Sequence, residues 1–526
     1  MKSPRHSPAS GVLRFLLLAA ISLLDACGSL PAPPAHVAAA DEAVLTCVRY
    51  YQDLTEIIGR NHVKDAQSIA VKGYSYLHVN RFLTSLKPRL TRQDKLTQWV
   101  TLLAQLALQT HTLEIHNLPA EAQQALANMS PTQFQGGNNL SVLQQCSQTL
   151  LQHALSSPAN LQHIVQNANV PDDYRTWQRI VGLYPLVALP VASGINKWHK
   201  QSTAVLTTPT RDLPVAGALV RYTGADTSLA YENFADIRLA INASRQNALH
   251  IPLPDSTTQQ RLFASFSPIW EVDTVQNADK IGAATWQSNE AYPTADIARP
   301  TVYTLASHAY FNHEILLQLN YIVWFPSRPC TSALDLLCGN LDGLTWRVTL
   351  GTDGKPLIYD TIHNCGCYHS FFPTESLRPI PPAPITADSR SSLDETAFTP
   401  IDAPAVGIAQ HLVVRLEHRT HYIESLYIDT KTQSDAVLMA TEPYDTLRSL
   451  PFSDKHNKSL FQENALVVGS QRKERWFFWP LGVPSAGAMR QWGHHATAFI
   501  GRRHFDDPYL LIHSFIAVQF QNDENG

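Results

Sequence analysis

The sequence carries little charge and lacks several motifs that would assign it to a functional class. Charged residues make up 16% of its 526 residues and the formal net charge is −4, against the ~25% charged residues of a typical soluble domain. Nucleic-acid binding needs a basic field that neutralises phosphates, so we expect no nucleic-acid partner. The chain also has no phosphate loop and no dinucleotide-binding glycine pattern, so nothing indicates nucleotide chemistry.

Complete catalytic motifs are missing as well. Ser485 has no glycine two positions before it, which a nucleophile elbow requires. His313 and Glu314 continue into an apolar run without a second histidine at zinc-peptidase spacing. The sequence therefore indicates no hydrolase of a standard type.

The N-terminal residues combine positive charge, a short apolar run and a cysteine. The basic residues are Lys2, Arg5 and Arg14. The apolar run 15–24 is too short to span a bilayer, and Leu24-Asp25-Ala26-Cys27 follows it. This arrangement resembles the lipobox of bacterial lipoproteins, which implies cleavage before Cys27 and attachment of acyl chains such as palmitate to that cysteine. An ordinary cleaved signal peptide is the alternative.

The residue after the cysteine bears on location. Gly28 stands where lipoproteins retained in the inner membrane often carry Asp, so the resemblance implies an outer-membrane anchor with the body facing the periplasm. The proline- and alanine-rich residues 28–40 are typical of a semi-rigid tether. We therefore expect the protein to be attached to the membrane by its N-terminal lipid anchor.

Hydrophobic periodicity divides the mature chain into a helical part and a β-rich part. Residues 91–108 and 171–192 show helical spacing, whereas 301–325, 344–363, 412–416 and 423–428 alternate as strands do. Turn sequences at 312–314 and 351–354 predict that 301–325 and 344–363 each form a hairpin. We predict an α+β fold with a C-terminal, mainly antiparallel sandwich or curved sheet. The expected segments are a signal peptide (1–26), the lipidated cysteine and tether (27–40), a helical domain (41–203), a mixed α/β connector (204–295) and a β-rich domain (296–526).

Six cysteines remain after Cys27, an even number in an oxidising compartment. Six cysteines allow 15 pairings. By locality we expect disulfides between Cys47 and Cys146 and between Cys330 and Cys338. The remaining pair, separated by one residue, forms a strained and labile bridge, binds another group, or pairs elsewhere.

The segment 362–369 places four potential ligands at alternate positions: His363, Cys365, Cys367 and His369. In an extended strand such neighbours lie ~6.6–6.8 Å apart, so one zinc ion or other divalent metal can take all four only if the chain turns at Gly366. Further candidate metal or redox residues from elsewhere are His418, His421, His494, His495 and Asp506. The alternative is a labile disulfide with structural histidines.

Two apolar stretches allow both a structural and a surface interpretation. Residues 182–192 contain two prolines five apart, and we expect a kinked helix packed in the core rather than a segment that enters a membrane. Residues 476–480 hold four aromatic side chains after a charged run. We expect these rings in the core, with binding of glycan or an envelope protein as the alternative.

Two functions follow from these observations. The first is a non-enzymatic envelope lipoprotein that binds or organises a component of the outer membrane. The second is a metal-dependent envelope hydrolase centred on His363 and His369. No family resemblance extends into the mature chain, so no catalytic residue is assigned.

Overall fold

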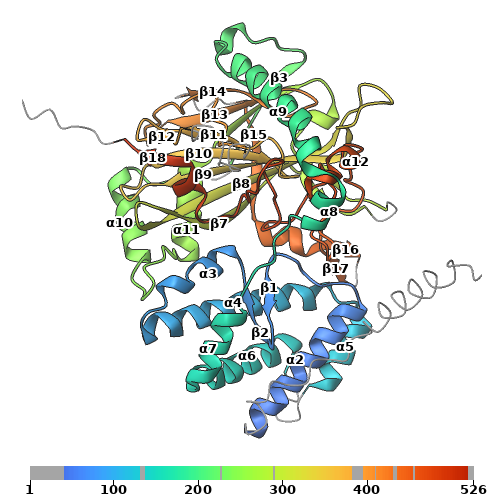
Figure 1. The fold of residues 1–526 in the computed structure, drawn as a ribbon, viewed down its shortest axis with the longest axis vertical. Helices are drawn as coiled ribbons and strands as arrows, with labels where there is room; N and C mark the ends of the chain where they lie inside the picture. Colours follow the sequence, from blue (N-terminus) through green and yellow to red (C-terminus); the bar gives the residue numbers. More distant parts are fainter. Residues whose placement is uncertain are drawn as a thin grey trace, which may run out of the picture.

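The computed structural model describes residues 41–130, 137–224, 228–287, 291–381, 395–408, 410–429, 435–453 and 456–518. The predicted signal peptide, Cys27 and the tether lie outside these residues. The described chain forms a helical half and a sheet half, drawn one above the other in Figure 1. Helices dominate the N-terminal part and a large curled sheet the C-terminal part, which confirms the predicted α+β class.

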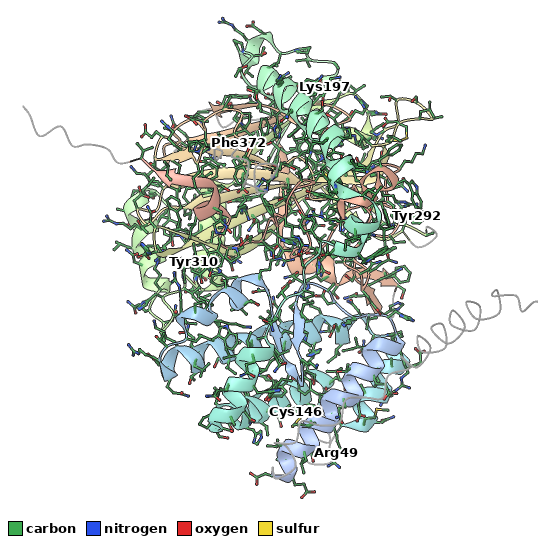
Figure 2. All side chains as sticks on the ribbon, in the orientation of Figure 1. Arg49, Cys146, Lys197, Tyr292, Tyr310 and Phe372 are labelled. Atoms are coloured by element: carbon green, nitrogen blue, oxygen red, sulfur yellow. A yellow bond between two sulfur atoms is a disulfide. The ribbon has the colours of Figure 1, made fainter. Side chains whose placement is uncertain are left out.

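The helical half packs around one apolar core. Its helices are α2 (Glu42–Arg60), α3 (Arg81–Ser85), α4 (Gln93–Asn117), α5 (Ala120–Met129), α6 (Asn139–Ser156) and α7 (Pro158–Asn167), and its hairpin is β1 (Ile69–Val71) with β2 (Tyr74–Val79). A disulfide from Cys47 on α2 to Cys146 on α6 crosses this core, as predicted. Figure 2 labels Cys146 in the lower half of the molecule.

The large sheet contains ten strands in the described residues, in the order β11-β10-β9-β8-β7-β15-β3-β4-β13-β14. The first five are consecutive antiparallel strands: β7 (Thr301–Phe311), β8 (Glu314–Arg328), β9 (Gly339–Leu350), β10 (Pro356–His363) and β11 (Ser370–Pro373). Both predicted hairpins are therefore confirmed. The predicted disulfide between Cys330 and Cys338 closes the connection from β8 to β9.

The other half of the sheet mixes parallel and antiparallel pairs. Its strands are β15 (Val437–Pro443), β3 (Ala218–Gly224), β4 (Ile269–Thr274), β13 (His411–Leu416) and β14 (Ile423–Asp429). Strand β15 runs parallel to both β7 and β3, and β13 runs parallel to β4. The segment expected as a connector thus contributes β3 and β4 to the middle of the sheet. It also supplies α10 (Phe234–Ser244) and α11 (Ser256–Phe266), whose apolar residues join the core of the sheet.

Short elements complete the fold. The short strands are β5 (Ala283–Thr285), β6 (Thr294–Asp296), β12 (Leu377–Pro379), β16 (Leu450–Ser453), β17 (His456–Lys458) and β18 (Phe515–Ala517). The short helices are α12 (Arg475–Phe478), α13 (Leu510–Ser514), η2 (Lys87–Arg89), η4 (Thr210–Asp212), η5 (Asn277–Asp279), η7 (Tyr444–Arg448) and η8 (Trp479–Leu481).

Helices α8 (Thr176–Val181) and α9 (Tyr184–Leu206) follow the helical half in sequence but lie against the sheet half (Figure 1). Gly182 separates them, and a β-carbon there would lie 2.5 Å from Pro480 of η8. Helix α9 continues through Pro190, and Ala188 and Leu206 are its buried residues. The prediction that 182–192 packs in the core is therefore wrong: the stretch forms an outer helix. Among the described residues, no helix has the length and apolarity to cross a bilayer.

Candidate functional site

The segment 362–369 is a hairpin loop and not an extended strand. Strand β10 ends at His363 and β11 begins at Ser370. Gly366 has φ +93°, its N–H donates to the carbonyl of His363 at 2.7 Å, and a β-carbon on it would lie 2.9 Å from the carbonyl oxygen of Ala496. The chain therefore turns at Gly366, the one condition under which its four candidate ligands can converge.

The turn nevertheless sends the two histidines to opposite faces of the sheet. His363 on β10 is paired with Leu344 on β9. Asp342 lies two residues before Leu344 on β9, so its side chain is on the same face of the sheet as His363. The Nδ1 atom of His363 lies 3.6 Å from Asp342 Oδ1. Asp360 lies three residues before His363 on β10, and because side chains alternate along a strand it projects from the other face. There His369 Nε2 lies 2.9 Å from Asp360 Oδ2. Both histidines are buried. Burial lowers the pKa of each, for His369 to about 4.

Of the remaining candidate ligands, His421 shares a carboxylate with His363, since its Nδ1 is 2.8 Å from Asp342 Oδ2. His418 lies at another carboxylate, with its Nδ1 3.4 Å from Asp273. His494 lies at the junction of the two halves, where its Nδ1 contacts Asp173 and its Nε2 the carbonyl of Ala66, both at 2.7 Å. His495 is buried near the hairpin loop, and burial lowers its pKa to about 3.

An arginine lies beside the carboxylates that contact His363 and His369, and another beside the candidate ligand Asp506. Arg472 lies 3.6 Å from Asp342, Arg347 lies 2.5 Å from Asp360, and Arg81 lies 3.1 Å from Asp506. A guanidinium beside a carboxylate neutralises the charge that would attract a cation. No group of three or more histidine, cysteine, aspartate or glutamate side chains able to hold a metal occurs in the described part of the chain. The predicted zinc or other divalent-metal site near His363 and His369 thus lacks a ligand set there.

Cys365 and Cys367 are buried free thiols in the hairpin loop. A hydrogen bond with Cys365, followed by burial, raises the pKa of Cys367 well above its ordinary value. A thiol with a raised pKa is a poor nucleophile, because the thiolate is the reactive form. Both side chains are buried, and Cys367 also lines a cavity.

The hairpin loop does line a cavity. This cavity has a volume of about 580 Å³ and lies between α9, the loop, α12 and residues 496–499. Its apolar lining residues are Val187, Pro190, Val191, Ile195, Trp198, Leu337, Phe477, Phe478, Ala496, Ala498 and Phe499. Such a volume falls in the ~300–1,000 Å³ range of small-molecule sites. We call it the α9 cavity.

A few polar groups reach the α9 cavity. Burial raises the pKa of Glu474 to about 7, and no side-chain hydrogen bond of Glu474 occurs within the described residues. The indole Nε1 of Trp198, another lining residue, is buried and has no hydrogen-bond partner among the residues that the structure describes. Tyr368 and Tyr422 pack edge to face with ring centroids 4.6 Å apart. The cavity therefore offers an apolar body, a carboxyl group that is protonated below neutral pH and a buried N–H donor.

Exposed apolar side chains lie on the two helices that line the cavity, and of these only Phe477 is itself a lining residue. Trp476 and Phe477 of α12 are 69% and 62% exposed, and Leu186 and Leu189 of α9 are 68% and 58% exposed. The predicted core placement of residues 476–480 is wrong for Trp476 and Phe477, because α12 is a short surface helix. The two apolar stretches of the sequence were the available signal for this site, and we had interpreted both as core.

Comparison with known proteins adds no relative from which a function could be transferred. No family model, no curated protein and no solved structure matches this chain.

Proposed function

We propose that the protein is a cell-envelope lipoprotein, anchored through Cys27 in the outer membrane and facing the periplasm, that binds the hydrocarbon chain of an envelope amphiphile. The lipobox-like N-terminal sequence supports the anchor. The α9 cavity is the observation that carries the binding function. A bound acyl chain would be stabilised by about 0.8 kcal/mol for each methylene group that leaves water.

The polar groups of the cavity suit the oxygen-bearing end of such a ligand. A carboxyl group with a pKa near 7 is largely protonated below neutral pH, and a protonated carboxyl donates a hydrogen bond. Together with Trp198 Nε1, Glu474 can donate to the carbonyl oxygen of an ester or a fatty acid. Trp198 Nε1 is buried without a partner among the described residues, so a ligand oxygen that accepts its hydrogen would remove the cost of leaving it unpaired.

The exposed apolar side chains of α9 and α12 support delivery from a membrane. Isolated apolar side chains on a surface are ordinary, whereas several on the two helices that line an apolar cavity favour an interaction surface. Lys473 and Arg475 precede Trp476, and the Arg475 guanidinium lies 4.8 Å from the centre of the Trp476 ring. Basic and aromatic side chains in this arrangement suit an anionic lipid interface.

A glycine in α9 allows a direct test. A β-carbon at Gly194, which lines the cavity, would meet no atom within 4 Å, so Gly194→Phe should fill the cavity without disturbing α9. Gly59 in α2 is equally unobstructed, and Gly59→Phe is the matched control. Residues 28–526 would be produced in the periplasm, and bound lipids would be extracted and quantified by mass spectrometry.

We expect co-purifying lipid in the wild type and in Gly59→Phe, with a loss of tenfold or more in Gly194→Phe. Titration with a fluorescent fatty acid should give the same ranking. Absence of lipid and of probe binding in the wild type, or equal binding by both variants, would refute the proposal.

The anchor has its own test. Cells expressing the full chain would be labelled with radioactive palmitate and fractionated. The wild type should carry label in the outer membrane, and Cys27→Ser should carry none. An unlabelled, soluble wild-type protein would favour the ordinary signal peptide.

A further inference from the structure

A second cavity lies between the helical half and the sheet half and has a different chemical character. Its volume is about 510 Å³. Gln67, Asn80 and Gln109 line it from the helical half, and residues 304–308 of β7 and Trp492 line it from the sheet half. We call it the interdomain cleft.

Buried ionic contacts hold the two walls of the cleft in place. Arg448 Nη2 and Nε lie 2.9 and 3.0 Å from the two carboxylate oxygens of Asp65, and Gln491 Nε2 donates to the same carboxylate at 2.7 Å. Asp65 precedes Gln67 by two residues, and Arg448 ends the η7 helix that supplies Tyr444 and Asp445 to the cleft. The cleft is therefore a preformed site rather than a loose gap between two bodies.

Amide and hydroxyl side chains dominate the lining of the interdomain cleft. The lining amides are Gln67, Asn80, Gln109, Gln259, Gln260 and Gln318. The Oε1 atom of Gln67 is buried and has no hydrogen-bond partner among the described residues. A buried acceptor without a partner is costly, and a donor from a ligand would satisfy it. Asn80, Gln109 and Gln318 already make hydrogen bonds within the protein. Because an amide both donates and accepts several hydrogen bonds, the remaining capacity of these side chains matches a ligand rich in hydroxyl groups.

The charges in the cleft argue against other classes of ligand. No lysine or arginine is among the described residues that line it, so no such side chain there would bind a phosphate or sulfate group. Of its three carboxylates, Asp445 is paired with Arg448 at 2.8 Å and Asp506 with Arg81 at 3.1 Å, and the third, Glu442, is exposed and accepts a hydrogen bond from Thr446. A single exposed carboxylate attracts a polycation weakly, so the cleft favours an uncharged ligand.

Aromatic rings supply the remaining surface. Trp492 and Phe82 line the cleft, and Phe82 stacks on His308 with ring centroids 4.7 Å apart. Flat rings give a large contact area with little loss of side-chain freedom, and the C–H faces of a sugar ring pack on them. We propose that the interdomain cleft binds an uncharged oligosaccharide, a site distinct from the α9 cavity.

The test removes the unpartnered amide without disturbing the fold. Gln67→Leu keeps the volume of the side chain and deletes only its polar atoms, so it should be neutral or stabilising for folding. Gln145→Leu, on the exposed side of α6, is the matched control. The full chain in a detergent without a sugar headgroup would be tested on an array of uncharged and anionic oligosaccharides and titrated with each uncharged one retained.

We expect saturable binding of at least one uncharged oligosaccharide, weakened about tenfold or more by Gln67→Leu and unchanged by Gln145→Leu. A Trp492→Ala variant, checked for folding by circular dichroism, should weaken the same binding. The proposal is overturned if no uncharged oligosaccharide binds, if only anionic ones bind, or if neither Gln67→Leu nor Trp492→Ala alters the affinity. Displacement of the bound sugar by spermidine at equal concentration would also overturn it, since that result assigns the cleft to cations.

Discussion

The folding stability of the protein should depend on pH through the buried side chain of Glu474. Burial against the apolar α9 cavity raises the pKa of its carboxyl group from the ordinary 4.5 to about 7. The folded protein therefore keeps a proton that the unfolded chain releases between these two values. The stability contributed by the neutral carboxyl is complete below pH 4.5 and is lost as the pH rises through 7. At 1.36 kcal/mol per unit of pKa, the loss reaches about 3 kcal/mol at pH 8.

Glu474→Gln removes the ionisation and keeps the size of the side chain. We expect the variant to unfold with the same free energy as the wild type at pH 4.5 and to be more stable by about 3 kcal/mol at pH 8. The assay is urea-induced unfolding at a series of pH values, with the slope checked for constancy. Glu375→Gln, at an exposed glutamate, is the control. Equal effects at both pH values, or a destabilised variant at pH 8, would refute the raised pKa.

The same variant also tests whether Glu474 contacts the ligand. Ionisation of the carboxyl removes its proton donor, so the affinity of the wild type for a fluorescent fatty acid should fall as the pH rises through 7. In Glu474→Gln the amide donates at every pH, and the affinity should stay constant. A wild-type affinity that does not change with pH would mean that Glu474 lies outside the ligand's reach.

Three further predictions concern the surface, the junction and the hairpin loop. Replacing the exposed Leu186 and Leu189 together by Ser should lower binding to anionic liposomes about tenfold and leave thermal stability unchanged; equal liposome binding would exclude α9 from the interface. Arg448→Met leaves Asp65 buried without its main cation and should cost about 3–5 kcal/mol in urea unfolding; a cost below 1 kcal/mol would contradict the rigid junction. Gly366→Ala forces a side chain into a positive-φ position close to a backbone carbonyl and should lower the free energy of unfolding by about 1–3 kcal/mol. A variant as stable as the wild type would contradict the turn at Gly366.

The sequence alone predicted the local part of the fold. Alternation of apolar residues predicted the hairpins β7–β8 and β9–β10, since period-two patterns arise when one face of a strand is buried. The spacing of the cysteines predicted both disulfides, because Cys47 and Cys146 lie in the predicted helical domain and Cys330 and Cys338 lie close together in sequence. The hairpins and the Cys330–Cys338 disulfide depend on neighbours along the chain. The Cys47–Cys146 disulfide spans 99 residues, and its prediction depended on placing both cysteines in one helical domain.

Tertiary structure decided the sites. The sequence placed His363 and His369 in one ligand group. In the structure they lie on opposite faces of the sheet, because the chain turns between them and side chains alternate along β10. His363 contacts Asp342 of β9 and His369 contacts Asp360 of β10, and an arginine lies beside each of these carboxylates. It also placed residues 182–192 and 476–480 in the core. Apolar residues are common in cores and at binding surfaces alike, so hydrophobicity alone does not distinguish the two. Only the packing of α9 and α12 against the sheet half shows which apolar faces were left uncovered, because burial depends on partners that lie far away in the sequence.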